Sequence, residues 1–469
     1  MKRTLVPAFL SLLFLSNCAT MAPKYVRPAA PVPGAWPSGE AYGPAEARGG
    51  AFSSADLPWG DFFRNGSLRK VIALSLSNNR DLKVAALAIE RSQALYGIRR
   101  ADLFPQVDAT GGGLVTRTPE TLTGTGKAVT SRRYDVGLAV AGYELDFFGR
   151  VRSLKDRALS DYLATEQARR SVQVGLVSEV AVRWFALAAD RERLGVARET
   201  LSGQEKSYEL TKRRFEGGVS SELDLRQAQT SVDSARVDIA RYTALVAQDR
   251  NALDLLAGAP VPEELLPAEL DTVTAMKEFS TGLPAEVLLL RPDILEAEEA
   301  LKGANANIGA ARAAFFPRIT LTTSVGLGSE ELGDLFRGAA GTWSFAPRVS
   351  VPIFDGGANR ASLKVAEADR DIAVARYEKA IQAAFHEVAD ALALRGTLGN
   401  QLSAQQSLVD AATVTRKLSD ARYEKGVDSY LSVLDAQRTL YAARQDLIAV
   451  RLALLANRVT LYRVLGGGG

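Results

Sequence analysis

Histidine and cysteine are almost absent from this sequence, which has one of each among 469 residues. Zinc sites built from these ligands need several of them, and Ser–His or Cys–His catalysis needs a histidine beside the nucleophile. The single histidine, His386, lies in the helical run AAFHEVADAL and is most simply a helix-surface or packed residue. The composition therefore argues against a His/Cys metal site and against a Ser–His or Cys–His catalytic centre. An enzyme has no support in the sequence, and we expect no metal and no cofactor.

A strong charge of one sign is lacking too. The formal net charge is +3, and Lys2 and Arg3 supply two of those charges. Domains that bind nucleic acid carry a basic stripe or patch, and the sequence has none. We therefore expect no nucleic-acid partner.

Proline is missing from two long tracts, one between Pro119 and Pro260 and one after Pro352. Because proline interrupts helices, such tracts permit long ones. Composition and spacing predict helices at about 67–103, 151–215, 223–256, 286–314, 358–424 and 430–465. A helix of ~60 residues is ~90 Å long at 1.5 Å per residue. That length is typical of a coiled-coil or helical-barrel shaft rather than of a compact domain.

Other segments alternate between apolar and polar residues. After Pro317, one face would carry Ile319, Leu321, Val325 and Leu327, and the other Thr320, Thr322 and Ser324. A period of two predicts a strand with one apolar face. We predict strands at about 107–117, 133–147, 318–328 and 343–354, with an apolar face on the fourth from Trp343, Phe345, Val349, Val351 and Ile353.

The chain carries this plan twice. Gly97, Arg100, Phe104 and Pro105 recur as Gly309, Arg312, Phe316 and Pro317 at one constant offset. The segments RRFEGGVSSELDLRQAQ (213–229) and ARYEKGVDSYLSVLDAQ (421–437) also correspond. We predict an internal duplication of a helix–hairpin–helix unit, in which Arg100 and Arg312 either bond the last carbonyls of their helices or line the change from helix to strand.

The N-terminus has the features of a targeting segment. Lys2 and Arg3 precede an apolar stretch at Leu5–Leu15 that is too short to span a membrane comfortably. The stretch ends at Leu-Ser-Asn-Cys, which resembles a bacterial lipobox, although Asn17 stands where Gly, Ala or Ser is preferred. Cys18 would then be the lipid-modified first residue of the mature chain. The alternative is an ordinary secretory signal with an incidental cysteine.

These features predict five segments along the chain. A lipoprotein signal peptide (1–17) precedes a proline-rich, extended tether (18–66), which Trp36 and Trp59 could pin to the body. The first repeat (67–258, hairpin 107–147) and the second (285–469, hairpin 318–354) flank a proline-rich linker (259–284).

Four strands are too few to close a membrane barrel, since bacterial outer-membrane barrels begin at eight. An open sheet in lipid would leave its edge groups unpaired, which is prohibitive. We therefore predict a mainly α chain with a membrane β part, whose long α-helical barrel and 12-stranded β-barrel are shared by a homotrimer with four strands per chain. Aromatic residues near the strand ends suit membrane-interface girdles, with plain core packing as the alternative: Phe104, Phe147, Phe148, Phe315, Phe316 and Trp343.

Several motifs together resemble the TolC-type outer-membrane channel proteins, and most closely the NodT-like lipoprotein branch that serves resistance-nodulation-division efflux pumps. They are APKYVRPAAPVP (22–33), YELDFFGRVRS (143–153), RPDILEAE (291–298), NIGAARAAFFPRITL (307–321) and RYEKGVDSYLSVLDAQ (422–437). The resemblance covers essentially the whole mature chain.

The resemblance implies an efflux channel that performs no chemistry. The trimer would lie in the outer membrane, anchored in lipid at Cys18 with its helical part in the periplasm, and would bind a periplasmic adaptor protein and an inner-membrane resistance-nodulation-division pump. It would export drugs or other toxic small molecules by passive passage. Metal-ion efflux and type I protein secretion are alternatives within the family, although three methionines disfavour copper or silver. A periplasmic coiled-coil adaptor or structural lipoprotein would leave the four strands unexplained.

The resemblance also implies a gate at the periplasmic end. Tyr423, Leu431 and Asp435 match positions that the family uses to constrict the closed aperture, and Asp224 is the first-repeat counterpart. A ring of three Asp435 carboxylates would repel when crowded, and could select cations or weaken the closed state. The alternative for Asp435 is a helix N-terminal charge favoured by the macrodipole.

Overall fold

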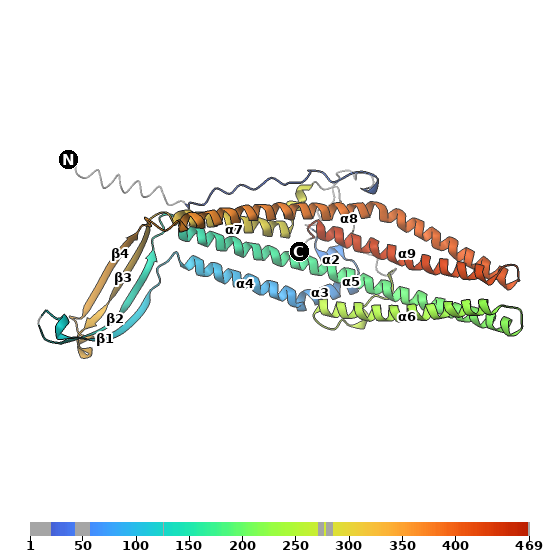
Figure 1. Cartoon of the computed structure of the whole chain (residues 1–469), viewed down its shortest axis with the longest axis horizontal. Helices are drawn as coiled ribbons and strands as arrows, with labels where there is room; N and C mark the ends of the chain where they lie inside the picture. The colour runs from blue at the N-terminus through green and yellow to red at the C-terminus, as the bar shows by residue number, and fades with distance from the viewer. Residues whose placement is uncertain (1–19, 43–56, 125, 271–275, 278–284, 468–469) are drawn as a thin grey trace. The chain divides into compact units, whose positions relative to one another are not determined.

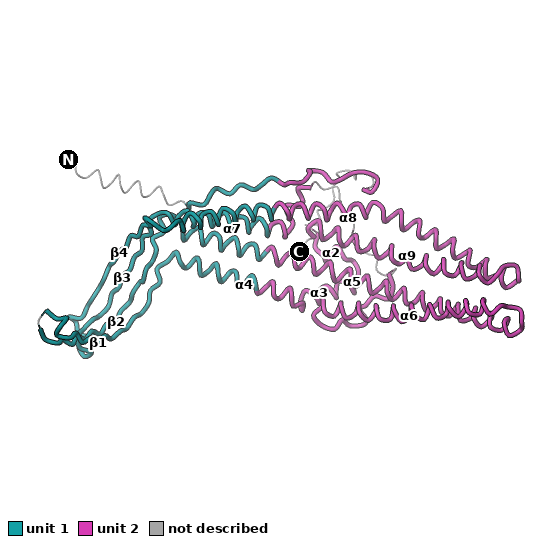
Figure 2. Tube along the Cα trace, in the orientation of Figure 1, with its two compact units in different colours: residues 1–29, 88–166, 296–377 teal, residues 30–87, 167–295, 378–469 magenta. Residues whose placement is uncertain are grey.

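The computed structural model describes residues 20–42, 57–124, 126–270, 276–277 and 285–467. The chain divides into two compact units, and each unit draws on both halves of the sequence (Figure 2). Unit 1 comprises residues 1–29, 88–166 and 296–377, and unit 2 comprises residues 30–87, 167–295 and 378–469. The predicted lipidation site, Cys18, lies outside the described residues.

Unit 1 contains a four-stranded antiparallel sheet in the order β1-β2-β3-β4 (Figure 1). Its strands are β1 (Asp108–Thr118), β2 (Val129–Glu144), β3 (Arg318–Ser329) and β4 (Gly341–Ser350). The two hairpins come from the two halves of the chain and meet at the β2–β3 pair. Strands β1 and β4 therefore form open edges of the sheet within one chain.

The two faces of the sheet differ in polarity. Leu138 of β2, Val325 of β3 and Trp343 of β4 lie in one cross-strand row. These three apolar side chains are 51%, 61% and 79% exposed. On the opposite face, the hydroxyls of Ser324 and Ser344 lie 2.7 Å apart. The predicted alternation in β3 is confirmed, and it leaves a broad apolar surface uncovered in the single chain.

The fourth strand is shorter than the sequence predicts. It ends at Ser350, so Val351 and Ile353 do not belong to its apolar face. Pro352 has no N–H to continue the ladder, whereas Pro347 is tolerated within β4 because β4 is an edge strand.

Two glycines face each other where β2 and β3 join. Gly137 and Gly326 are direct partners in the ladder. A Cβ on Gly137 would lie 2.6 Å from the Val325 carbonyl oxygen, and one on Gly326 would lie 2.7 Å from Gly137 Cα. A bulge follows between Val140 and Tyr143, where Gly142 has a φ of 70°. The sheet can bend at this point because the glycines there have no side chains that would clash.

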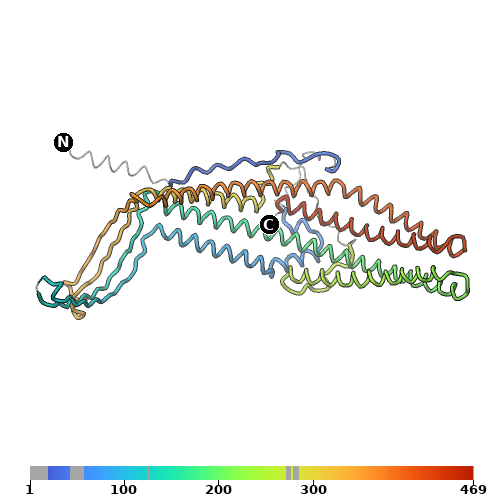
Figure 3. Tube along the Cα trace, viewed as in Figure 1, coloured from blue at the N-terminus to red at the C-terminus, as the bar shows by residue number. Residues whose placement is uncertain are grey.

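The predicted long helices are present. Helices α5 (Arg150–Glu216) and α8 (Ala358–Glu424) each have 67 residues, or about 100 Å at 1.5 Å per residue. They lead into α6 (Glu222–Ala257) and α9 (Tyr430–Val464), which gives two helical hairpins in unit 2, drawn green and red in Figure 3. An 18-residue stretch of α5 is long and apolar enough to cross a membrane, but 61% of it is buried within the chain.

Two predicted helices have different boundaries. The expected helix at 67–103 is divided into α3 (Gly66–Asn78) and α4 (Arg80–Ala101) at Asn79. The side-chain oxygen Oδ1 of Asn79 accepts from the Leu82 N–H, while its side-chain amide nitrogen donates to the Leu256 carbonyl, both at 3.0 Å. Asparagine thus ends one helix and caps the next without a proline. The helix expected at 286–314 is a 3₁₀ helix, η6 (Ala285–Leu290), followed by α7 (Pro292–Ala313), which starts with proline at a position where no N–H is needed.

The hydrophobic core of unit 2 lies where α3, α5, α6 and α9 meet. Phe62 of the short helix α2 (Trp59–Phe62) stacks on Tyr462 with ring centroids 4.2 Å apart. Trp184 of α5 is fully buried, and its indole N–H donates to the Leu265 carbonyl at 2.9 Å. Buried aromatic rings pack in this core among many aliphatic side chains.

The N-terminal segment is held to the helices. In unit 1, Glu298 of α7 is buried and accepts hydrogen bonds from Tyr25 (3.0 Å) and Arg27 (2.9 Å). Burial raises the pKa of Glu298, but these bonds outweigh it and hold the pKa below its ordinary value. In unit 2, the Trp36 ring stacks on Phe385 at 5.1 Å, which confirms that Trp36 pins the segment.

Candidate functional site

The ends of the two helical hairpins have the same backbone geometry. Gly218 and Gly426 have φ values of 72° and 74°, which only glycine adopts without strain. After each glycine, the N–H of Val219 or Val427 donates to a carbonyl five residues earlier, at 2.8 and 2.9 Å. Both turns therefore close with a Schellman-type motif, as the duplication predicts.

Asp224 lies in the first turn of α6 and makes a capping box with Ser221. Its carboxylate accepts from the Ser221 N–H at 3.2 Å and from the Ser221 hydroxyl at 2.8 Å. It also accepts from the Ser220 hydroxyl at 3.1 Å. These contacts satisfy the helix start, so Asp224 has a structural role at this tip.

The second tip is closed by an ion pair that the sequence analysis missed. The Arg422 guanidinium donates to both carboxylate oxygens of Asp428, at 2.6 and 2.9 Å. The hydrogen bond raises the pKa of Arg422 and lowers that of Asp428. The two residues lie on either side of the Gly426 turn. The geometry of the turn brings them together, so the residue types alone do not predict the ion pair.

Tyr423 lies between the two hairpins. The Arg214 guanidinium of α5 is 4.5 Å from the Tyr423 ring centroid, and the Tyr430 ring of α9 is 5.4 Å away. Tyr430 itself is buried with Val433, Leu434 and Ala228 of α6. Burial raises the pKa of Tyr430 to about 12. Tyr423 therefore belongs to a small cluster that holds the two tips together.

Leu431 and Asp435 are one turn apart on α9 and both are exposed. Leu431 is 59% exposed, so the described part of the chain leaves most of this apolar side chain uncovered. Asp435 makes no hydrogen bond or ion pair with any residue that the structure describes. Of the four predicted gate residues, these two have side chains that are free to meet other molecules.

Polar contacts continue along the hairpins above the tips. The Tyr441 hydroxyl of α9 donates to Asp238 of α6 at 2.8 Å. Arg444 and Arg451 of α9 pair with Glu199 and Glu192 of α5, at 3.0 and 3.1 Å. Sequence reasoning did not find these pairs, because they join segments more than two hundred residues apart.

A pair of acidic residues lies within the first hairpin. Asp190 of α5 is buried and accepts from Arg193 at 2.8 Å. One carboxylate oxygen of Asp249 on α6 is buried without a hydrogen-bond partner among the described residues. Burial, the negative charge of Asp190 and a hydrogen bond to it raise the pKa of Asp249 to about 6. A proton shared between the two carboxyl groups would account for the raised pKa of Asp249.

Ion pairs join the elements at the helix–strand junction in unit 1. Glu144 pairs with Arg150 at 2.6 Å and with Arg318 at 2.7 Å. Arg312 donates to the Met21 carbonyl at 3.4 Å, so the expectation that it bonds the end of its own helix is wrong. The N-terminal segment, at Met21, accepts the Arg312 hydrogen bond in place of the last carbonyls of α7.

No group of three or more His, Cys, Asp or Glu residues that could hold a metal ion occurs in the described part of the chain. His386 is an exposed helix residue within reach of Asp390, at 3.1 Å. The arrangement at the tips is one of packing and charge rather than of catalytic groups.

Known proteins resemble this chain over almost its whole length. The family model "Outer membrane efflux protein" matches residues 71–259 and 283–467, one stretch in each half. The toluene efflux pump outer membrane protein TtgC of Pseudomonas putida is 47% identical over 469 residues, which covers 100% of this chain and 96% of TtgC. The outer membrane protein OprJ of Pseudomonas aeruginosa is 42% identical over 464 residues, which covers 99% of this chain and 95% of OprJ.

Solved structures agree. The open state of the MtrE outer membrane channel of Neisseria gonorrhoeae superposes with a TM-score of 0.86 at 37% identity, covering 96% of this chain and 98% of MtrE. The predicted fold class and the predicted family are thereby confirmed. The chain belongs to the outer membrane efflux protein family.

Proposed function

We propose that this chain is the outer-membrane channel of a tripartite efflux pump that exports toluene-like solvents, drugs and other small toxic organic molecules. The observation that carries this proposal is the full-length similarity to relatives named for toluene efflux, together with an open sheet whose apolar face is uncovered. The channel provides passive passage and needs no catalytic group or cofactor.

The functional channel is a homotrimer. One chain supplies four strands with open edges at β1 and β4. Such edges are not tolerated in lipid, because no water is present to bond their N–H and C=O groups. Three copies supply twelve strands and close the barrel, with the row of Leu138, Val325 and Trp343 facing the lipid.

The barrel and a lipid anchor both hold the chain in the outer membrane. The barrel spans the membrane, and Cys18, after removal of residues 1–17, adds a lipid anchor. Residues 18–66 form the tether, 67–258 and 285–469 the two repeats, and 259–284 their linker. The helical hairpins extend into the periplasm, where their tips meet a periplasmic adaptor protein that connects the channel to an inner-membrane resistance-nodulation-division pump.

The periplasmic gate is formed by the tips. Leu431 and Asp435 face the aperture, because they are exposed and unpaired on α9. Tyr423 holds the second tip against the first through Arg214, and it packs on Tyr430 of its own hairpin. Asp224 keeps the first tip folded by capping α6. The gate opens when the contacts of Tyr423 break.

A deletion strain complemented with this gene tests the proposal. Complementation should restore resistance to toluene and to several unrelated drugs, and leave copper and silver tolerance unchanged. Restored tolerance of metal salts alone would favour a metal-ion efflux channel, and restored export of a protein substrate would favour type I secretion. Either of those results would overturn the proposed substrate class.

A further inference from the structure

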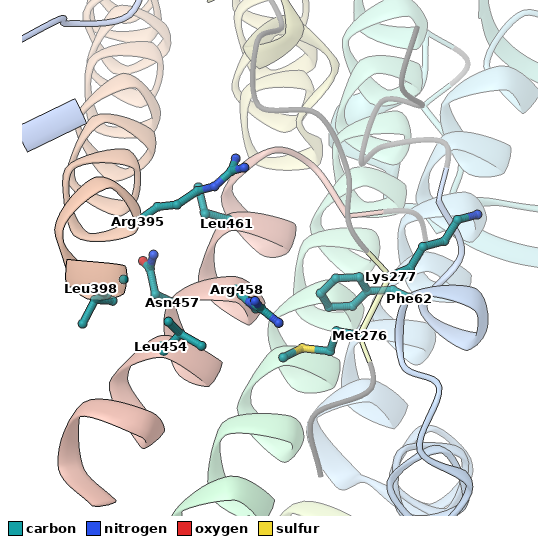
Figure 4. A pocket seen from close by; sticks show the side chains of 10 residues that line it. Phe62, Met276, Lys277, Arg395, Leu398, Leu454, Asn457, Arg458 and Leu461 are labelled. Atoms are coloured by element: carbon teal, nitrogen blue, oxygen red, sulfur yellow. The ribbon is translucent and has the colours of Figure 1, made fainter. Parts of the chain in front are cut away.

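Unit 2 contains a cavity of about 310 Å³ between α8, α9 and the segment at Met276–Lys277 (Figure 4). One wall is fixed by the pairing of this segment with the chain after α2, where the Lys277 N–H donates to the Phe62 carbonyl at 2.9 Å. Phe62, Met276 and Leu461 give the cavity an apolar surface. Its size suits a small organic molecule rather than a peptide segment.

A buried polar side chain lines this cavity. Asn457 of α9 is 6% exposed, and its amide N–H donates to the Ala391 carbonyl at 3.1 Å, which fixes the side chain. Its carbonyl oxygen has no hydrogen-bond partner among the residues that the structure describes. That oxygen is also closed off from solvent, so Asn457 shapes the wall of the cavity rather than binding its contents.

The charged residues that line the cavity, among those that the structure describes, are basic. Arg395, Arg458 and Lys277 line it, and none of the described lining residues is acidic. Arg458 has no ion pair or hydrogen bond with a described residue, and it points from α9 toward Met276 in Figure 4. A partly buried guanidinium is a strong site for a carboxylate, because its donors fit both oxygens.

We propose that this cavity binds an amphipathic organic carboxylate. The apolar body lies against Phe62, Met276 and Leu461. The carboxylate faces Arg458. A neutral molecule of the same shape would leave the guanidinium without a counter-charge and binds more weakly.

Calorimetry on the purified full-length protein in phosphatidylcholine nanodiscs tests this site, because these lipids carry no net charge. N-(2-naphthoyl)glycine is the probe, since it combines an aromatic body and a carboxylate. Its neutral glycinamide analogue is the matched ligand. We expect one probe per chain, and at least tenfold weaker binding of the neutral analogue, since a charge-assisted hydrogen bond is worth a factor of this order.

Three variants separate the cavity from the general surface. Arg458→Gln should weaken probe binding at least tenfold, and Leu454→Trp, which fills the cavity from its lining, should abolish it. Arg438→Gln is the control, because Arg438 is an exposed arginine on α9 outside the cavity. Unchanged far-UV circular dichroism and oligomer mass confirm that each variant folds.

Absence of binding to the unmodified protein overturns the proposal. The proposal is also overturned if Arg458→Gln and Leu454→Trp bind the probe as tightly as the unmodified protein does. It is likewise overturned if the neutral analogue binds as tightly as the charged probe. Loss of binding in Arg438→Gln to the same extent as in Arg458→Gln would show that the probe responds to surface charge and would equally refute the site.

Discussion

The contact between Arg214 and Tyr423 offers the sharpest test of how the tips are held together. Replacing Tyr423 by alanine removes the ring that lies 4.5 Å from the Arg214 guanidinium and 5.4 Å from the Tyr430 ring. A cation–π contact at a partly exposed site contributes about 0.5–1 kcal/mol. An aromatic pair adds about 0.5–1.5 kcal/mol beyond its buried area. Of these two contacts, only the one with Arg214 joins the two hairpins, since Tyr423 and Tyr430 belong to the same hairpin. The substitution should therefore weaken the contact between the tips by about 0.5–1 kcal/mol per chain.

That free energy corresponds to a roughly 2- to 5-fold shift toward open tips in each chain, since 1.4 kcal/mol is a factor of ten. Single-channel recording in planar bilayers should show a matching rise in open probability, and Tyr423→Ala cells should become sensitive to large antibiotics. Tyr423→Phe keeps the ring and should behave as the unmodified channel. In a double-mutant cycle, Arg214→Ala should add little to Tyr423→Ala, because both remove the same contact.

Unchanged open probability in Tyr423→Ala would refute the reasoning. Strictly additive effects of Arg214→Ala and Tyr423→Ala would refute the specific contact, even if each variant alone opened the channel.

Three further outcomes are expected. Leu431→Ala and Asp435→Ala should each raise basal conductance and antibiotic sensitivity; unchanged values of both would remove these residues from the gate. The pKa of Asp249 in the folded protein is about 6, above its ordinary value of ~3.9. Protonation of Asp249 therefore stabilises the fold fully below about pH 4, and this stabilisation is lost as the pH rises through 6. Asp249→Asn should therefore flatten the dependence of Tm on pH between 4 and 7, while Asp233→Asn, an exposed acid on the same helix, should not; coincident curves for Asp249→Asn and the unmodified protein would contradict the shared proton. Gly326→Ala places a Cβ 2.7 Å from Gly137 Cα and should cost about 1–3 kcal/mol, seen as a lower Tm and a lower trimer yield, whereas Gly333→Ala, with open space around it, should change neither.

The sequence was sufficient to predict most of the helices and strands and their repetition in the two halves of the chain. Proline-free tracts predicted α5 and α8 closely, because long amphipathic helices depend on local composition and on the absence of breakers. The alternation after Pro317 predicted β3 for the same local reason. Asn79 was missed as a helix boundary, because its role depends on the Leu256 carbonyl, which arrives from a distant part of the chain.

The site was only partly predictable. Leu431 and Asp435 came from motif resemblance, and the structure adds that both are exposed on one face of α9. The cluster of Arg214, Tyr423 and Tyr430 depends on the packing of two hairpins, which no single stretch of sequence encodes. The carboxyl pair at Asp190 and Asp249 was missed for the same reason, since burial rather than residue type gives it its properties.

The mass of the intact particle extracted from outer membranes tests the central claim most directly. Native mass spectrometry after mild detergent extraction should give three chains per particle, because only copies of this chain can pair the open edges of β1 and β4. A single chain, or a protein that salt alone releases from the membrane, would contradict the shared barrel and with it the channel.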